Sequence, residues 1–230
     1  MTRQRRWRAR LSESPRSVPM SCAVSHPVFS RVYPYIARAG EKGGAGEHRR
    51  ALLAGLEGRV IEVGAGHGLN FAYYPPTVSE VLAVEPEAHL RELARRAAER
   101  VTVSVSVIAG SAEALPAGDG EFDAAVVSLV LCSVPDQDLA LREIHRVLHG
   151  GAELRFYEHV IAREPRAARV QRVLDATIYP HLTGGCHCAR DTGAAIRQSG
   201  FEIEREERIA FKPSPLAPVI PHILGMARRS

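Results

Sequence analysis

Residues 61–68, IEVGAGHG, join the end of an apolar run to three closely spaced glycines. The β-branched residues at 59–63 favour a short buried strand. The glycines permit positive φ angles and let a ligand approach the backbone closely. A glycine-rich loop alone is weak evidence, because several nucleotide-binding folds contain one. The segments on either side therefore decide the fold.

Apolar runs of similar length recur along the chain and alternate with segments of helical periodicity. The sequence predicts further strands at 80–85, 101–108, 122–131, 153–160, 200–211 and 220–228. It predicts helices at 88–100, 136–148 and 164–178, and two helical segments within 26–58 that are broken by Pro34 and by the glycines of 40–46. Gly150 and Gly151 have the character of a helix C-cap. This alternation indicates a parallel sheet with helices on both faces.

Length and composition limit the class of protein. The chain has 230 residues, of which 45% are hydrophobic and 24% are charged, so we expect one domain over residues 25–230 with an N-terminal helical lid. No apolar run reaches the ~18 residues of a membrane span, and no apolar signal core is present. The four cysteines are too scattered for a disulfide framework. We therefore expect a cytoplasmic protein.

The net charge of +4 is concentrated at the N-terminus. Residues 1–19 contain six arginines and one acid, a net charge of +5, which leaves −1 for residues 20–230. We expect residues 1–24 to form a disordered basic tail. The near-neutral remainder and the aromatic content of 6% argue against a nucleic-acid partner.

Three features around the expected sheet predict a nucleoside ligand. Glu62 stands two residues before the first glycine in the pattern ExGxGxG, which is not the dinucleotide spacing and suits a ligand that carries positive charge. Glu85 ends the second strand, where a carboxylate can accept both hydroxyls of a ribose. The polar turn at 109–116, AGSAEALP, can meet an adenine edge. All three follow strand ends, where open parallel sheets bind ligands.

These motifs, in this order and followed by FDAAVVSLVL at 122–131, resemble the class I S-adenosylmethionine (SAM)-dependent methyltransferases with a methyltransferase type 11 domain. The resemblance implies a Rossmann-like α/β fold, in which a seven-stranded, mostly parallel sheet ends in an antiparallel strand. It also implies SAM as the cofactor. Carried over position by position, it implies a cofactor-binding set of Glu62, Gly64, Gly66, Gly68, Asn70, Glu85, Pro86, Ser111, Ala112, Glu113, Ser128, Leu129 and Cys132.

Four further stretches narrow the resemblance. SLVLCSVPD (128–136), LRFYEHV (154–160), GGCHCARDT (184–192) and PHILGMA (221–227) are similar to the alkyl-thiol branch of methyltransferase-like proteins and its bacterial relatives. The resemblance implies a small-molecule methyl acceptor, with a thiol preferred. The alternatives are an N or O acceptor, a nicotinamide-dependent oxidoreductase, and a module that binds SAM without turnover.

The stretch GGCHCARDT allows three chemical interpretations: a metal site, a nucleophile with its base, or the wall of a pocket. Cys186, His187 and Cys188 are adjacent, and neighbouring side chains point apart, so we expect no metal. Displacement at a sulfonium needs no covalent enzyme intermediate, which argues against a nucleophile. We interpret Cys186 and Arg190, together with Tyr33 of the lid, as substrate contacts; a structural turn is the alternative.

Two histidines are candidates for catalysis. His159, at the end of the fifth strand, and His187 could deprotonate or orient the acceptor, although either could be structural. A thiol of pKa ~8.5 is already partly ionised at neutral pH. Tyr33 and Tyr35 could cover the sulfonium by cation–π contact, although tyrosines more often pack in a core.

Overall fold

The computed structural model describes residues 27–212 and 219–230. The predicted tail, residues 1–24, lies outside these ranges, and no helix within them is long and apolar enough to cross a membrane. The strands are β1 (Gly58–Val63), β2 (Val78–Val84), β3 (Val105–Ile108), β4 (Phe122–Ser128), β5 (Leu148–His159), β6 (Phe201–Phe211) and β7 (Ile220–Arg229).

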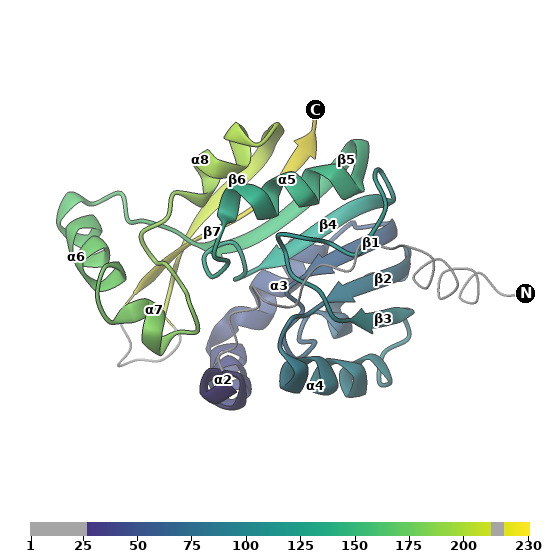
Figure 1. The fold of residues 1–230 in the computed structure, drawn as a ribbon, viewed down its shortest axis with the longest axis horizontal. Helices are drawn as coiled ribbons and strands as arrows, with labels where there is room; N and C mark the ends of the chain where they lie inside the picture. The colour runs from purple at the N-terminus through teal and green to yellow at the C-terminus, as the bar shows by residue number, and fades with distance from the viewer. Residues whose placement is uncertain (1–26, 213–218) are drawn as a thin grey trace, which may run out of the picture.

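The strands form one seven-stranded sheet in the order β3-β2-β1-β4-β5-β7-β6 (Figure 1). The neighbouring strands β3, β2, β1, β4 and β5 all pair in parallel. Strand β7 pairs antiparallel with both β5 and β6. The predicted sheet with an antiparallel last strand is therefore confirmed. The strand order reverses between β1 and β4, and the carboxyl edge at such a point is where open α/β sheets bind ligands.

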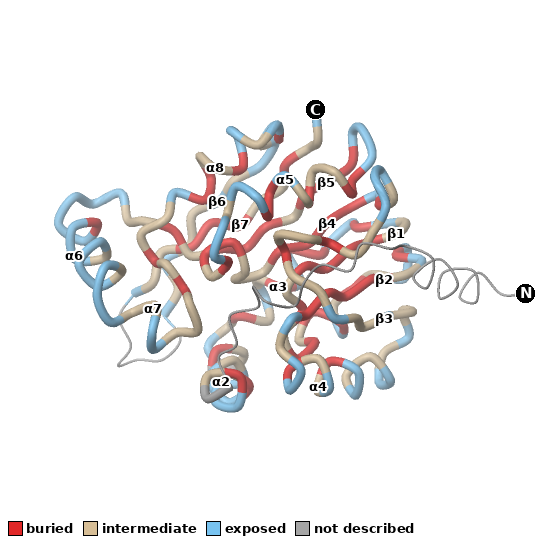
Figure 2. Tube along the Cα trace, in the orientation of Figure 1, coloured by how far each residue is buried: buried red, intermediate tan, exposed pale blue. Residues whose placement is uncertain are grey.

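Helices cover both faces of the sheet, as predicted. They are α2 (Pro27–Gly40), α3 (Gly46–Leu53), α4 (Ala88–Ala98), α5 (Gln137–Val147), α6 (Pro165–Asp175), α7 (Tyr179–Leu182) and α8 (Thr192–Gln198), with short turns η2 (Glu41–Ala45) and η3 (Phe71–Tyr73). Val60 of β1 packs in one cluster with α3 and α4, while Ile61 packs in another with α5 and α8. The central strands β1, β2 and β4 are mostly buried, whereas the edge strands β3 and β6 and most of α6 are partly or fully exposed (Figure 2).

Three strand and helix boundaries differ from the prediction. Strand 101–108 begins only at Val105. Strand 122–131 ends at Ser128, because Leu129 adopts a φ of +61°, which a strand does not allow. Gly150 and Gly151 do not cap α5, since the residue that follows Val147 is already extended. Both glycines lie inside β5, where its register with β4 shifts.

The N-terminal helices break at one of the two predicted positions, the glycine-rich stretch, and not at Pro34. Pro34 lies within α2 and does not end it. The interruption comes at Gly44, in the glycine-rich stretch, where φ is +105°. A proline removes one backbone hydrogen bond, whereas a positive φ redirects the chain, so Gly44 and not Pro34 separates α2 from α3.

Candidate active site

A crevice opens at the carboxyl edge of β1 and β4. Its lining residues are Tyr33, Arg49, Glu62, Gly64, Ala65, Gly66, His67, Leu69, Asn70 and Ser128. Six of these ten were predicted from the sequence as cofactor or substrate contacts: Tyr33, Glu62, Gly64, Gly66, Asn70 and Ser128. The glycine-rich loop, the end of β4 and the N-terminal helices therefore meet at one place.

The three glycines of the loop have different surroundings. A Cβ atom at Gly64 or Gly68 would lie within 3 Å of side chains that pack against the loop, the ring of Phe71 in the case of Gly68. A Cβ atom at Gly66 would meet a single side-chain atom, at 3.6 Å, and the φ of +57° favours glycine there. Gly64 and Gly68 therefore allow close packing, and Gly66 leaves the crevice open to a ligand.

Glu62 is buried beneath the crevice with both carboxylate oxygens occupied. Oε1 accepts a hydrogen bond from Asn70 Nδ2 at 2.9 Å, and Oε2 accepts one from the Tyr74 hydroxyl at 2.8 Å. Burial raises the pKa of Glu62 to about 7. Glu62 fixes the amide of Asn70, so its influence on the crevice passes through that side chain.

Arg49 supplies a buried positive charge that the sequence analysis missed. Its Nη1 donates to Asn70 Oδ1 at 2.7 Å, and its Nε lies 2.8 Å from Glu41 Oε1. The residue is 6% exposed. Its signal in the sequence was a helical spacing of three and four residues from Leu52 and Leu53, which places Arg49 on the buried face of α3. A guanidinium here suits a ligand carboxylate.

Glu85 lies beside the glycine-rich loop, as predicted. Its two oxygens accept hydrogen bonds from the backbone N–H groups of Gly66, at 2.7 Å, and Glu87, at 2.9 Å. Burial raises its pKa to about 7, although both N–H groups oppose the shift. The next residue, Pro86, is exposed. The carboxylate therefore lies against the glycine-rich loop, and its contact with a ribose stays a prediction.

Four buried side-chain atoms lack a hydrogen-bond partner among the described residues: Nε2 of His67, Oε1 of Glu113, and the Nε atoms of Arg208 and Arg229. The first lies in the crevice, and the second lies in the predicted adenine-binding turn. Burial lowers the pKa of His67 to about 4, so the ring is neutral. An unpaired buried polar atom costs ~1–3 kcal/mol. The His67 and Glu113 atoms thus fit a ligand with polar groups at both ends, as an adenosyl amino acid has.

Ser111 and Ala112, which were also predicted to lie at the adenine, are in the turn that follows β3. Ser111 forms a β-bridge with Ala114, and this bridge closes the turn. Ala112 is buried within it.

Leu129, after β4, holds its positive φ through a hydrogen bond from its N–H to the Tyr157 carbonyl at 2.7 Å. A non-glycine residue in this conformation is strained, and such strain is concentrated at functional sites.

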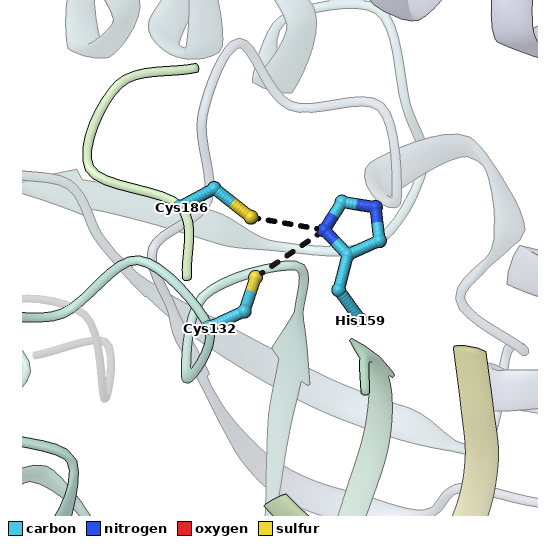
Figure 3. A group of neighbouring side chains, drawn as sticks. All are labelled: Cys132, His159 and Cys186. Atoms are coloured by element: carbon cyan, nitrogen blue, oxygen red, sulfur yellow. Dashed lines mark hydrogen bonds between the residues drawn. The ribbon is translucent and has the colours of Figure 1, made fainter. Parts of the chain in front are cut away.

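A second group of side chains joins three separate segments (Figure 3). Cys132 follows β4, His159 ends β5, and Cys186 lies in the insert between β5 and β6. The Nδ1 atom of His159 is 3.6 Å from Cys132 Sγ and 3.1 Å from Cys186 Sγ. Both cysteines are buried. The pKa of Cys186 is lowered because the Cys132 thiol and His159 donate to its sulfur, and the pKa of Cys132 is correspondingly raised.

Buried polar contacts hold the turn that bears Cys132. The carboxylate of Glu158 accepts from the N–H groups of Val130, at 2.9 Å, and Cys132, at 3.1 Å. Nη1 of Arg190 donates to the carbonyls of Leu131 and Val134. The Arg190 contacts described are thus with the turn itself, and a contact between Arg190 and the acceptor stays a prediction.

The neighbours of Cys186 in the insert point away from this group. Nδ1 of His187 is paired with Asp175 Oδ2 at 3.0 Å, and Cys188 Sγ donates to the Gln171 carbonyl at 3.8 Å. The described contact of the His187 ring is with Asp175 and not with the Cys132 turn. A catalytic role for His187 therefore stays a prediction. From the sequence, Cys132 and His181 were the possible further ligands to a metal at Cys186, His187 and Cys188. The structure instead brings Cys186 together with Cys132 and His159, which come from three separate segments.

Tyr33 of α2 lines the crevice, as predicted for the lid. Its ring meets the ring of His67 edge-on, with the centroids 5.6 Å apart. Burial raises the pKa of Tyr33, an effect that the charge of Arg49 opposes and that Glu85 and Cys132 reinforce. Tyr35 is 71% exposed, so the structure does not support its predicted role beside Tyr33.

Comparison with known proteins supports the same reading of the crevice. The family profile described as a methyltransferase domain matches residues 61–156. Human thiol S-methyltransferase TMT1B is 35% identical over 185 residues, which cover 76% of this chain and 73% of the relative. Human thiol S-methyltransferase TMT1A is 34% identical over 181 residues, with coverage of 76% and 73%.

A solved structure shows the same fold. A SAM-dependent methyltransferase from Thermotoga maritima, described as a possible histamine N-methyltransferase, superposes with a TM-score of 0.64 and 23% identity and covers 88% of this chain and 99% of its own. These matches support the methyltransferase over the alternative of a nicotinamide-dependent oxidoreductase, and SAM is the cofactor. This chain belongs to the class I SAM-dependent methyltransferases.

Proposed function

We propose that this enzyme transfers the methyl group of SAM to a small-molecule thiol. The observation that carries the proposal is the identity of 35% with thiol S-methyltransferases over about three quarters of the chain. The geometry adds a buried wall of sulfur and imidazole, made by Cys132, His159 and Cys186, next to the turn that borders the cofactor crevice. Such a wall suits a soft, weakly hydrated acceptor better than a charged amine.

We assign a partner to each part of the cofactor from the crevice and the turns next to it. Arg49 and Asn70 would bind the amino-acid end, Glu85 would accept the ribose hydroxyls, and Glu113 would lie at the adenine. Helix α2, which brings Tyr33 over the crevice, would act as the lid. These assignments use residues whose polar groups are buried and aimed at the crevice or its adjoining turns.

The chemistry places few demands on this chain. Bound SAM supplies a methyl group that is already activated by its sulfonium. The protein therefore has to hold the acceptor sulfur in line with that methyl group and exclude water, and positioning of this kind can contribute several kcal/mol. His159, which ends β5 beside Cys132 and Cys186, would take the proton of the thiol or orient the sulfur.

The test is turnover of SAM carrying a labelled methyl group with the purified enzyme. Small thiols, amines, phenols and carboxylates are offered separately, and Gly66→Arg protein serves as the background. We expect label on thiols. Label only on a nitrogen or oxygen acceptor would keep the methyltransferase and refute the thiol proposal. SAM binding without label on any acceptor would favour the binding-module alternative.

A further inference from the structure

The Cys132–His159–Cys186 group has the ligand types and the spacing of a zinc site. Its two sulfurs and Nδ1 lie within 4.8 Å of one another, and the nitrogen is 3.6 and 3.1 Å from the sulfurs. A tetrahedral zinc ion with Zn–S ~2.3 Å and Zn–N ~2.0 Å separates its nitrogen and sulfur ligands by ~3.6 Å. The two nitrogen–sulfur separations therefore match those of a tetrahedral zinc site to within about half an ångström.

The three ligands are held by contacts that do not depend on a metal. Glu158 and Arg190 fix the Cys132 turn from two sides. The backbone N–H of His187 donates to the Cys132 carbonyl at 2.6 Å and ties the Cys186 segment to that turn. The ring of His159 packs on that of His222, with the centroids 4.5 Å apart. Such preorganisation favours metal binding, because fewer groups must be ordered when the ion enters.

The charges of the group balance those of a divalent cation. Two cysteine thiolates neutralise Zn²⁺, and a neutral imidazole adds none, so the loaded site is uncharged and can remain buried. Among the described residues, this is the group of cysteine, histidine and acidic side chains whose ligand atoms converge in this way. Three protein ligands leave a fourth tetrahedral position, as in catalytic zinc sites.

We propose that Cys132, His159 and Cys186 bind one Zn²⁺ ion and that the acceptor thiol takes the fourth position. The assignment of the fourth ligand rests on the proposed thiol methylation, whereas the zinc site itself does not. On zinc binding the two cysteines release their protons to solvent. The acceptor then binds as a thiolate, and its proton also leaves to solvent.

Methyl transfer in this arrangement balances. A sulfur lone pair of the bound thiolate forms the new bond to the methyl carbon, and the old carbon–sulfur bond breaks with its electron pair remaining on the cofactor sulfur. The product thioether is neutral and a poorer zinc ligand than the thiolate, so it can leave. No oxidant or reductant is required. Zinc thus raises the fraction of acceptor that is ionised at neutral pH.

Metal content is the first measurement, since it does not depend on activity. Purified full-length enzyme is stripped by chelator, titrated with Zn²⁺ and analysed by mass spectrometry, and Co²⁺ is used in parallel for its absorption spectrum. We expect about one equivalent per chain, with thiolate-to-cobalt charge-transfer bands and the strong visible bands of a tetrahedral ion. Cys132→Ser and Cys186→Ser should each lose the bands and at least about tenfold in affinity.

Cys188→Ser is the matched control. Cys188 is as buried as Cys186 and lies two residues from it, but its thiol donates a hydrogen bond to the Gln171 carbonyl instead. It should bind zinc like the wild type, and circular dichroism should show that all three variants are folded. Binding of less than about a tenth of an equivalent by the wild type, or equal binding by Cys132→Ser and Cys186→Ser, would overturn the zinc site.

The acceptor tests the fourth ligand separately. Addition of a small thiol to the cobalt-loaded enzyme should change the visible spectrum and intensify the charge-transfer bands. Two outcomes would refute the acceptor thiol as the fourth ligand while leaving the proposed function intact. One is an unchanged spectrum with a thiol that the enzyme methylates, and the other is full thiol methylation by the metal-free enzyme. A stoichiometric zinc site in an enzyme that methylates no thiol would support the site and refute the proposed function.

Discussion

Replacement of Arg49 by glutamine should weaken SAM binding through the loss of one charged contact. Arg49 is 6% exposed, and its guanidinium is already aligned by Glu41 and Asn70 at 2.8 and 2.7 Å. A ligand carboxylate would meet a fixed cation that water screens little. The variant keeps a polar side chain, so Asn70 need not lose its partner.

The magnitude follows from the burial. Hydrogen bonds to charged groups contribute ~1.5–3 kcal/mol, and each ~1.4 kcal/mol is a factor of ten in the dissociation constant. The Kd for SAM should therefore rise about 10- to 150-fold. Arg49→Lys retains the charge without the planar fork and should recover part of this loss.

Calorimetry with two ligands separates direct contact from an effect on the fold. SAM carries the carboxylate, and methylthioadenosine, which lacks the whole amino-acid end, does not. Arg49→Gln should weaken SAM by the stated factor and methylthioadenosine by less than about threefold. Arg50→Gln is the matched control, because Arg50 is exposed on the same helix and contacts only the ring of Tyr73 in the interactions described. Equal loss for both ligands would refute the carboxylate contact.

Three further substitutions test the crevice and the insert. Gly66→Arg should abolish SAM binding with the far-ultraviolet circular dichroism retained, because a side chain here enters the crevice; undiminished binding would contradict this placement of the loop. Since the pKa of Glu85 is about 7 and ribose hydroxyls favour the ionised carboxylate, affinity for SAM should rise as pH increases through 7, and Glu85→Gln should flatten that rise. An unaltered pH profile would argue against Glu85 as the ribose ligand. Cys188→Ser should retain SAM binding and turnover, and its inactivity would show that the second cysteine of the insert is needed.

The sheet and the cofactor loops could be predicted because each depends on local pattern. The apolar strands and the helical spacing of residues such as Leu90 and Ala94 are recorded in short windows of sequence. The glycine-rich loop and Glu85 follow strands directly, so strand order alone brings them together. The early end of β4 arose because the positive φ angle of Leu129 outweighed the apolar pattern that continues to Leu131.

Arg49, His67 and the cysteine–histidine group show what local pattern leaves out. Arg49 was missed because arginines on a helix usually face solvent. Its spacing from Leu52 and Leu53, however, places it on the buried face of α3. His67 stands within the predicted loop, but only the packed structure shows that its Nε2 atom is buried without a partner among the described residues.

The cysteine–histidine group depends on tertiary contacts rather than on the motif that suggested it. The sequence presents three adjacent residues that look like one unit, Cys186, His187 and Cys188. In the structure their side chains point in different directions: that of Cys186 toward Cys132, that of His187 toward Asp175 and that of Cys188 toward Gln171. The chemically important neighbours of Cys186 are therefore 54 and 27 residues away in the chain. Because β4 and β5 are parallel neighbours, their carboxyl ends place Cys132 and His159 side by side whatever the insert does. The insert contributes one ligand, so variation in its length or sequence could change the third ligand while the sheet keeps the other two.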